Sequence, residues 1–261
     1  MPAGYPAPVR CVLEPTEYLS VDRERAGAVH IPLAELPRRT HELPPPHKLI
    51  RVVRGSPEAY GALGWLHARG WRAVLADAPA HANSDARYRL WEPNEWLQQV
   101  APHLAVGRAL DLGCGSGRDA VYLAACGWQV VAVDRLPEAL ERGRALQTHY
   151  APDSPPIEWI CTDLEKDPWQ PVSRFELITL FFFFSREVLQ RALEWLAPRG
   201  ALVIEAFTTI HRARFGKPAS EKRVVHPDEL PALVANQLRV VAYSEGWQTN
   251  GRHTARLWAQ H

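Results

Sequence analysis

The chain has 261 residues, with 30 basic and 29 acidic side chains and a formal net charge of +1. This balance gives no electrostatic basis for binding nucleic acid or an anionic membrane, and no apolar run reaches the roughly 20 residues of a membrane span. The length suits two modest domains or one large one, with an ample core in either case.

The N-terminal part of the chain consists of short alternating elements. Apolar runs predict strands at residues 48–53 and 71–75, with a helix over residues 58–69 between them. The polar, small residues 81–85 mark a domain boundary. The expected organisation is a small α/β domain over residues 1–82, a linker with a leading helix over residues 83–104, and a second domain over residues 105–261.

A glycine-rich loop follows the apolar strand predicted over residues 109–112. Gly113, Gly115 and Gly117 stand at every second position, and a helix follows at once. Glycine lacks a Cβ, so such a loop turns sharply and lets a ligand lie against bare backbone. The dinucleotide fingerprint would place its third small residue one position later, where this chain has Arg118. Asp111 is well placed to hold a cationic amine, whereas a phosphate cradle has little use for a carboxylate there.

Two further acids end predicted strands. Asp134 follows the strand over residues 128–133, about 20 positions after the glycine loop, where a βαβ unit places a carboxylate beside the ribose hydroxyls. Proteins that bind NAD share this feature, so Asp134 alone does not choose the cofactor. Asp163 follows the apolar run over residues 157–161.

Aromatic and acidic residues end the next two predicted strands. Four phenylalanines at residues 181–184 follow the fourth strand, at the edge where open α/β sheets bind ligands. We favour Phe181 as the ring that faces a positively charged ligand group, with packing in the core as the alternative. Glu205 lies in the fifth strand, over residues 201–207. A buried acid needs a partner or a function, and the alternative is an ion pair with Arg212 or Arg214.

The basic segment 208–223, which contains His211 and Lys217, follows the fifth strand where a lid over the substrate would lie. If it is functional, it favours a substrate with an anionic group, and otherwise it is a solvated loop. Residues 238–243 and 254–259 predict two closing strands, with the turn residues Asn250 and Gly251 between them.

The glycine loop with the three acids resembles the cofactor site of the Rossmann-like methyltransferases that bind S-adenosylmethionine. This resemblance implies a seven-stranded sheet with a closing antiparallel hairpin. It also implies that Asp163 accepts from the adenine amino group, with Leu164 against the ring. The aromatic segment and residues 205–208 and 214–218 look like the branch related to tellurite-resistance and thiopurine enzymes. The expected cofactor-binding residues are Asp111, Gly113, Gly115, Gly117, Asp134, Arg135, Asp163, Leu164 and Phe181.

Residues 30–33 and 66–71 resemble a rhodanese-like domain. The nucleophilic cysteine of an active rhodanese would fall at Val53, and valine carries no nucleophile. We therefore expect a degenerate accessory domain that covers the active site, binds a protein partner or mediates dimerisation.

The expected function is transfer of a methyl group from S-adenosylmethionine to a small soluble acceptor by in-line displacement. A general base is needed only if the acceptor loses a proton, and the candidates are Glu205 and His211. The alternatives are a non-catalytic cofactor-binding scaffold or sensor, and a protein or RNA methyltransferase that recruits its substrate through the first domain. The four cysteines lack metal-like spacing and no export signal is visible, so we expect a cytoplasmic protein without a metal.

Overall fold

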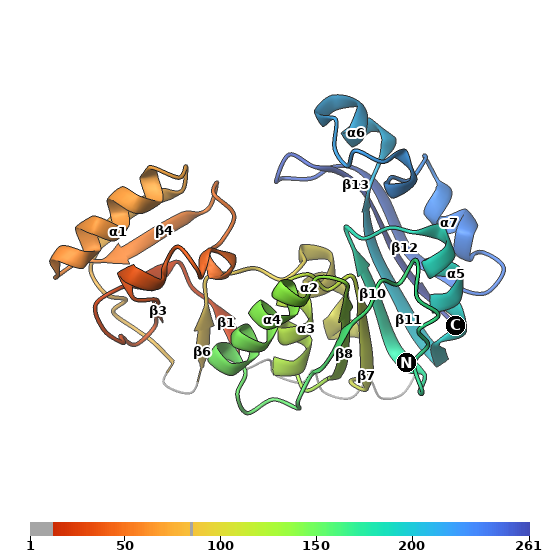
Figure 1. Ribbon diagram of the computed structural model, residues 1–261, viewed down its shortest axis with the longest axis horizontal. Helices are drawn as coiled ribbons and strands as arrows, with labels where there is room; N and C mark the ends of the chain where they lie inside the picture. Colours follow the sequence, from red (N-terminus) through yellow and green to blue (C-terminus); the bar gives the residue numbers. More distant parts are fainter. Residues whose placement is uncertain (1–12, 84–85) are drawn as a thin grey trace, which may run out of the picture.

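The structure, a computed structural model, describes residues 13–83 and 86–261. Figure 1 shows two lobes, each built on a sheet of its own. The elements up to the second lobe are β1 (Leu13–Pro15), β2 (Tyr18–Ser20), β3 (Val29–His30), η1 (Leu33–Glu35), η2 (Thr40–Glu42), β4 (Leu49–Val53), α1 (Pro57–His67), β5 (Arg72–Ala76) and β6 (Arg87–Arg89).

The N-terminal lobe contains four parallel strands in the order β3-β2-β4-β5. The predicted strands at residues 48–53 and 71–75 are confirmed as β4 and β5, and the predicted helix as α1. Helix α1 buries Ala59, Ala62 and Leu66. Val53 ends β4 as a buried residue. The rhodanese-like resemblance of this lobe stays a prediction, as do the domain boundaries.

The second lobe follows a short leading segment. Its elements are α2 (Glu95–Val100), η3 (Ala101–His103), β7 (Arg108–Leu112), α3 (Arg118–Ala125), β8 (Gln129–Asp134), α4 (Pro137–Tyr150), β9 (Glu158–Cys161), β10 (Phe175–Phe181), α5 (Arg186–Glu194), β11 (Leu196–Phe207), α6 (Thr209–Phe215), η4 (Glu221–Arg223), α7 (Glu229–Val234), β12 (Arg239–Trp247) and β13 (His253–Gln260).

The large sheet has seven strands in the order β12-β13-β11-β10-β7-β8-β9. The five strands from β9 to β11 are parallel, and β13 and β12 close the sheet as an antiparallel hairpin. The mixed seven-stranded sheet is therefore confirmed. The chain runs outward from β7 through β8 to β9 and then crosses back to β10, which lies on the other side of β7. In open α/β sheets, ligands bind at such a switch point, outside the carboxyl ends of the strands.

Buried residues alternate between the two faces of this sheet. Ala109 of β7 belongs to the apolar cluster that includes α3, and its neighbour Leu110 belongs to the cluster that includes α5 and α7. Successive side chains of a strand point to opposite faces, so a sheet covered on both sides has nearly continuous apolar strands. This is why the strand sequences are uniformly apolar up to the acids at their ends.

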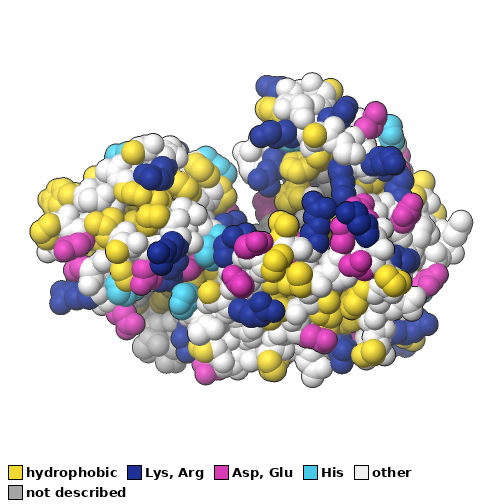
Figure 2. All heavy atoms as spheres, in the orientation of Figure 1, with side chains coloured by type: hydrophobic (Ala, Val, Ile, Leu, Met, Phe, Trp, Pro, Cys, Tyr) yellow, Lys and Arg dark blue, Asp and Glu magenta, His cyan; other side chains and the backbone are white. Residues whose placement is uncertain are grey.

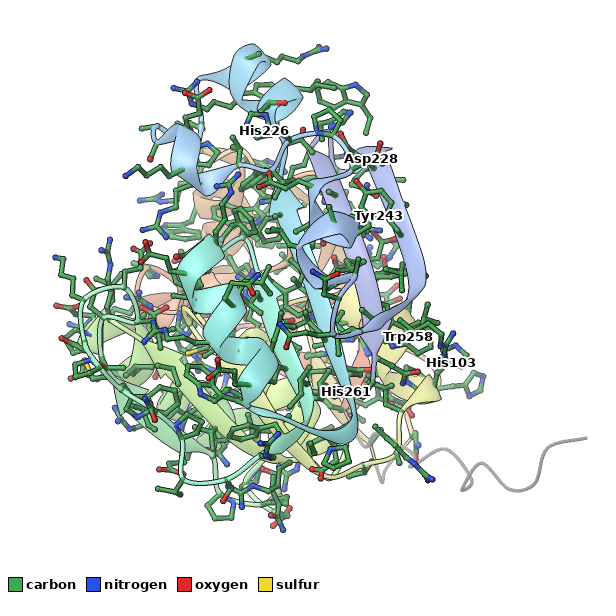
Figure 3. The ribbon with its side chains drawn as sticks, turned by 90° about the vertical axis from the view of Figure 1, so that its right-hand side faces the viewer. His103, His226, Asp228, Tyr243, Trp258 and His261 are labelled. Atoms are coloured by element: carbon green, nitrogen blue, oxygen red, sulfur yellow. The ribbon has the colours of Figure 1, made fainter. Side chains whose placement is uncertain are left out.

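The two lobes share one core. The same apolar cluster runs from β2 and β4 through Trp91 to α3 and β7. Strand β1 also pairs in parallel with β6, which lies after the N-terminal sheet in the chain. Figure 3 views the outer edge of the large sheet, where His103 of η3 stacks on Trp258 of β13 with ring centroids 6.0 Å apart. Within residues 13–83 and 86–261, no helix is long and apolar enough to cross a membrane.

A buried carboxylate fastens the lobes together. Glu42 of η2 accepts hydrogen bonds from Arg39 Nε and Nη2, both at 2.6 Å, and from the Tyr150 hydroxyl of α4 at 2.7 Å. The Glu42 side chain is 1% exposed and that of Arg39 is 15% exposed. Loss of either partner of such a pair is costly, because the remaining charge stays in a poorly hydrated environment without its main counter-charge.

We expect Glu42→Gln to lower the free energy of unfolding by about 3 kcal/mol, because it removes the buried carboxylate that binds Arg39 through two nitrogens and leaves only the exposed Glu35 as its partner. Urea denaturation of the full chain measures the effect. Glu35→Gln is the matched control, since Glu35 also pairs with Arg39 but is 51% exposed, and its loss should cost less than about 1 kcal/mol. Equal destabilisation by the two substitutions would contradict a special role for the buried pair.

Candidate functional site

The loop after β7 has left-handed backbone at all three glycines. Gly113, Gly115 and Gly117 have φ values of +74°, +54° and +74°. A Cβ on Gly113 would lie 2.5 Å from the Cβ of Phe183, and one on Gly117 would lie 2.4 Å from Trp159. A Cβ on Gly115 would meet nothing within 4 Å. Two glycines thus serve close packing, whereas the middle one presents bare backbone to open space.

Asp111, beneath this loop, is 2% exposed. Its Oδ1 accepts from the Thr179 hydroxyl at 2.9 Å, and its Oδ2 has no hydrogen-bond partner among the described residues. Burial raises the pKa of Asp111 to about 8, helped by the nearby Asp119 and Asp134 carboxylates and partly offset by the Thr179 hydrogen bond. Such an acid favours a cationic partner, which would compensate its buried charge.

Asp134 and Asp163 end neighbouring strands β8 and β9 on the same sheet edge. Asp134 Oδ2 accepts from the Gly115 N–H at 2.8 Å, which ties the acid to the glycine loop. Asp163 Oδ1 accepts from the Glu165 N–H at 3.1 Å, and Arg135 Nη1 lies 3.8 Å from its Oδ2. Backbone N–H groups hold both carboxylates in place, so their orientation does not depend on a ligand.

A cavity of about 490 Å³ opens at these carboxyl ends. It brings together six of the predicted site residues, whereas Asp111, Gly115, Gly117, Phe181 and Glu205 are not in its wall. The lining residues are Gly113, Asp134, Arg135, Leu136, Thr162, Asp163, Leu164, Glu165, Phe182, Phe183, Phe207, His211, Lys217, Pro218 and Arg223.

The aromatic rings that reach the cavity are Phe182, Phe183 and Phe207, rather than the favoured Phe181. Phe181 is the last residue of β10, is 8% exposed and packs in the core. Phe182 has left-handed backbone, with φ at +58°, and its N–H donates to the Glu205 carbonyl at 2.8 Å. The strand therefore ends in a sharp turn that presents the next ring, which the apolar run in the sequence does not reveal.

Glu205 is 1% exposed and both of its carboxylate oxygens are engaged. Oε1 accepts from the Thr254 hydroxyl at 2.8 Å and from Arg256 Nε at 3.0 Å. Oε2 accepts from Asn94 Nδ2 at 2.8 Å. The arginine of this ion pair comes from β13, not from positions 212 or 214. This geometry favours a role in holding the site together, and the role of general base stays an untested prediction.

Asn94 and Asp119 extend this network, and neither was selected from the sequence. The Asn94 N–H donates to Asp119 at 2.5 Å, while Asn94 Oδ1 caps α2. Burial raises the pKa of Asp119 to about 6, and the Asn94 N–H and Arg118 partly offset this effect. The available sequence signals were the helix start at Asn94 and the position of Asp119 directly after the glycine loop.

His211 lies in the cavity wall, stacked on Phe207 with ring centroids 4.4 Å apart. Its Nδ1 accepts from the His253 N–H at 3.2 Å. Burial lowers the pKa of His211, as do the charges of Arg252 and His253. A neutral ring with Nδ1 as acceptor carries its proton on Nε2. His211 is therefore a hydrogen-bond donor at the cavity wall, and its predicted role as a base also remains untested.

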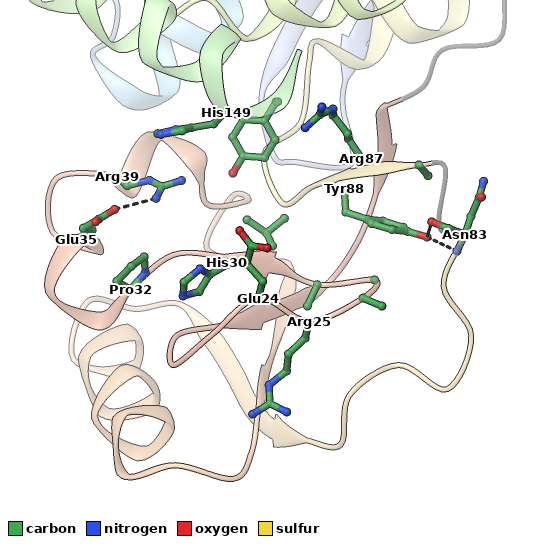
Figure 4. A pocket seen from close by; sticks show the side chains of 16 residues that line it. Glu24, Arg25, His30, Pro32, Glu35, Arg39, Asn83, Arg87, Tyr88 and His149 are labelled. Carbon is green, nitrogen blue, oxygen red and sulfur yellow. Dashed lines mark hydrogen bonds and ion pairs between the residues drawn. The ribbon is translucent and has the colours of Figure 1, made fainter. Parts of the chain in front are cut away.

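A second, larger cavity of about 850 Å³ lies between the N-terminal sheet and α4 (Figure 4). Figure 4 shows Arg39 between Glu35 and His149, with Arg87 on the other side of the opening. Arg39 is already paired with Glu35 and Glu42, and Arg87 is paired with Asp153. No strand end of the large sheet lines this cavity, so the predicted cofactor residues belong to the smaller one. The described residues contain no cluster suited to a metal ion.

Residues 109–200 match the family model of a methyltransferase domain. The chain is 26% identical over 130 residues to a ubiquinone biosynthesis O-methyltransferase of Bordetella avium. The aligned residues make up 50% of this chain and 49% of that protein. The fold is similar to TehB from Haemophilus influenzae, with a TM-score of 0.51, 20% identity and coverage of 63% of this chain and 60% of that chain.

The fold is also similar to the N-methyltransferase NodS from Bradyrhizobium japonicum in complex with S-adenosyl-L-homocysteine. The TM-score is 0.52 at 19% identity, over 64% of this chain and 84% of that chain. The chain spans about half the length of the curated relative. Residues 109–200 therefore match a methyltransferase domain, and the second lobe shares its fold with these solved methyltransferase structures.

We expect Asp111→Asn to flatten the pH dependence of stability. The folded pKa of about 8 exceeds the unfolded value of 3.8, so the contribution of this group is fully present below the unfolded pKa and is lost as the pH rises through the folded one. The free energy of unfolding of the ligand-free wild type should therefore fall more steeply than that of the variant between about pH 4 and about pH 8. If urea titrations give the same pH dependence of the free energy of unfolding for both proteins, burial does not raise the pKa of Asp111.

Proposed function

We propose that this chain transfers a methyl group from S-adenosylmethionine to a small soluble acceptor. The observation that carries the proposal is the convergence of Gly113 of the glycine loop, Asp134 and Asp163 on one cavity at the switch point of the sheet. The residues also fit the cofactor in charge, because Asp111 has a buried oxygen without a partner that suits a cationic amino group.

On this proposal the acids divide the binding of the cofactor between them. Asp134 accepts hydrogen bonds from the ribose hydroxyls, and Asp163 accepts from the adenine amino group with Leu164 against the ring. The Asp111 carboxylate compensates the positive charge of the amino group of the cofactor, and Gly115 leaves room for close approach of the ligand. S-adenosylmethionine supplies a methyl group already activated by a positively charged sulfur. The chain then has mainly to align the two reactants and to exclude water.

We further propose that the second lobe belongs to the methyltransferase branch related to tellurite-resistance and thiopurine enzymes. Its support is the aromatic segment at residues 181–184 and the basic segment that follows β11. The basic segment contributes His211, Lys217 and Arg223 to the cavity wall, in keeping with a lid over the acceptor.

For the N-terminal lobe, we propose an accessory role for a rhodanese-like domain without its cysteine. One contact supports a direct effect on the cofactor loop. Arg118, which follows Gly117, donates through Nε and Nη2 to the His41 carbonyl at 3.0 and 2.5 Å. The first lobe thus positions the residue at the start of α3. A protein partner or a second copy of the chain is a further proposal for this lobe.

The proposed location is the cytoplasm. Among the described residues, Cys114 and Cys161 are free thiols, as is usual where the environment is reducing.

We expect isothermal titration of the full chain to give micromolar binding of S-adenosylmethionine and S-adenosylhomocysteine, with no binding of NAD. Asp134→Ala should weaken binding of both adenosyl compounds by about tenfold or more, because a charged hydrogen-bond acceptor is lost. Glu158→Ala, on the exposed start of β9, is the control and should leave affinity unchanged. Absence of binding of both adenosyl compounds by wild type would refute the methyltransferase proposal. Unchanged affinity in Asp134→Ala would refute the assignment of Asp134 to the ribose hydroxyls.

A further inference from the structure

The cavity wall has two chemically different halves. One half contains the acids Asp134, Asp163 and Glu165, which the proposed function assigns to the cofactor side. The other half is aromatic and basic, and its side chains come from the end of β10, the end of β11, α6 and the segment after it. This acceptor half consists of Phe182, Phe207, His211, Lys217 and Pro218.

The rings of the acceptor half form a continuous row. Phe182 and Phe207 have ring centroids 4.9 Å apart, and Phe207 and His211 are nearly parallel at an interplanar angle of 22°. The row continues out of the cavity through Phe215, whose centroid is 4.7 Å from that of His211. Phe182 is 36% exposed and Phe215 is 48% exposed. Exposed, stacked rings at the rim of a cavity suit a planar ligand.

The charge around these rings is positive and uncompensated. Lys217 lines the cavity and has no carboxylate partner among the described residues, whereas Arg223 is paired with Glu165 on the cofactor side. Arg252 lies over Phe182 and Phe207, at 4.9 and 5.9 Å from their centroids, and it too has no carboxylate partner in residues 13–83 and 86–261. Figure 2 shows the hollow between the lobes, with Lys and Arg side chains gathered on the wall of the right-hand lobe. An anion entering this half would be attracted rather than repelled.

The acceptor half contains no group placed to remove a proton. None of its side chains is a carboxylate, and His211 presents Nε2–H because its Nδ1 already accepts from the His253 N–H. Glu205 is buried with both oxygens bound and lies outside the cavity wall. A neutral acceptor that must lose a proton during transfer would find no base here.

We infer that the acceptor is a planar molecule that enters as an anion, held between the Phe182–Phe207 rings and Lys217, with His211 donating a hydrogen bond to it. This inference rests on the proposed methyl transfer. An electron pair of the anionic atom forms the bond to the methyl carbon while the carbon–sulfur bond breaks and its pair returns to sulfur. The anion and the sulfonium both become neutral, and no proton is transferred.

Binding of simple probes to the full chain saturated with S-adenosylhomocysteine tests the inference. Isothermal titration with benzoate should show binding, and neutral benzamide of the same shape should bind at least about tenfold more weakly. Lys217→Met should weaken benzoate by about tenfold and leave benzamide unchanged, because only the charged ligand loses its partner.

Lys222→Met is the matched control, since it removes the same charge from η4, a few residues away and outside the cavity wall. It should leave the affinity for benzoate unchanged, and both variants should bind S-adenosylhomocysteine like wild type. Benzoate that binds no tighter than benzamide, or equal effects of the two substitutions, would overturn the anionic acceptor while the methyltransferase proposal stands. Failure of wild type to bind S-adenosylhomocysteine would instead refute the proposed function itself.

Discussion

The carboxylate of Glu205 is the interaction on which the arrangement of the site depends. Through Arg256 and Thr254 it joins β11 to β13, and through Asn94 it joins both strands to the leading segment. The N–H of the same asparagine holds Asp119 at the start of α3, directly after the glycine loop. One buried acid thus fixes the edge of the sheet against the loop that faces the cofactor. Because it is almost fully buried, its hydrogen bonds do not compete with water.

A second set of contacts brings the N-terminal lobe into the same structure. Arg118 donates to the His41 carbonyl, and the neighbouring Glu42 binds Arg39 and Tyr150. The apolar core is also continuous between the lobes. The first lobe is therefore packed firmly against the second. A displacement of the His41 carbonyl would move Arg118, which directly follows the glycine loop.

The two ends of the cavity differ in the charge of the side chains around them. Buried acids surround the glycine loop, and burial raises the pKa of Asp111 to about 8 and that of Asp119 to about 6. These groups disfavour a further negative charge and favour a cation. Uncompensated Lys217 and Arg252 lie toward the aromatic end, where they favour an anion. A cationic methyl donor and an anionic acceptor would thus lie next to each other. Such a site would act by orienting the two reactants rather than by acid–base catalysis.

The sequence by itself determined the local features of this protein. Glycine spacing predicts the turn, and continuous apolar runs predict a sheet covered on both faces. The acids at strand ends fall on one edge because parallel strands end together. The closing hairpin and the cavity edge that gathers Asp134 and Asp163 follow from the same regularities. These properties depend on backbone geometry over a few residues, which a single chain segment encodes.

Only the tertiary structure decided which side chains meet. Glu205 and Asn94 lie 111 positions apart, so no local pattern could pair them or show that the arginine of the ion pair is Arg256. The left-handed turn at Phe182 places this ring, rather than that of Phe181, in the cavity wall. The backbone N–H of His253 in β13 determines that Nδ1 of His211 accepts a hydrogen bond. Each outcome depends on packing between distant elements, where a shift of one residue changes the partner.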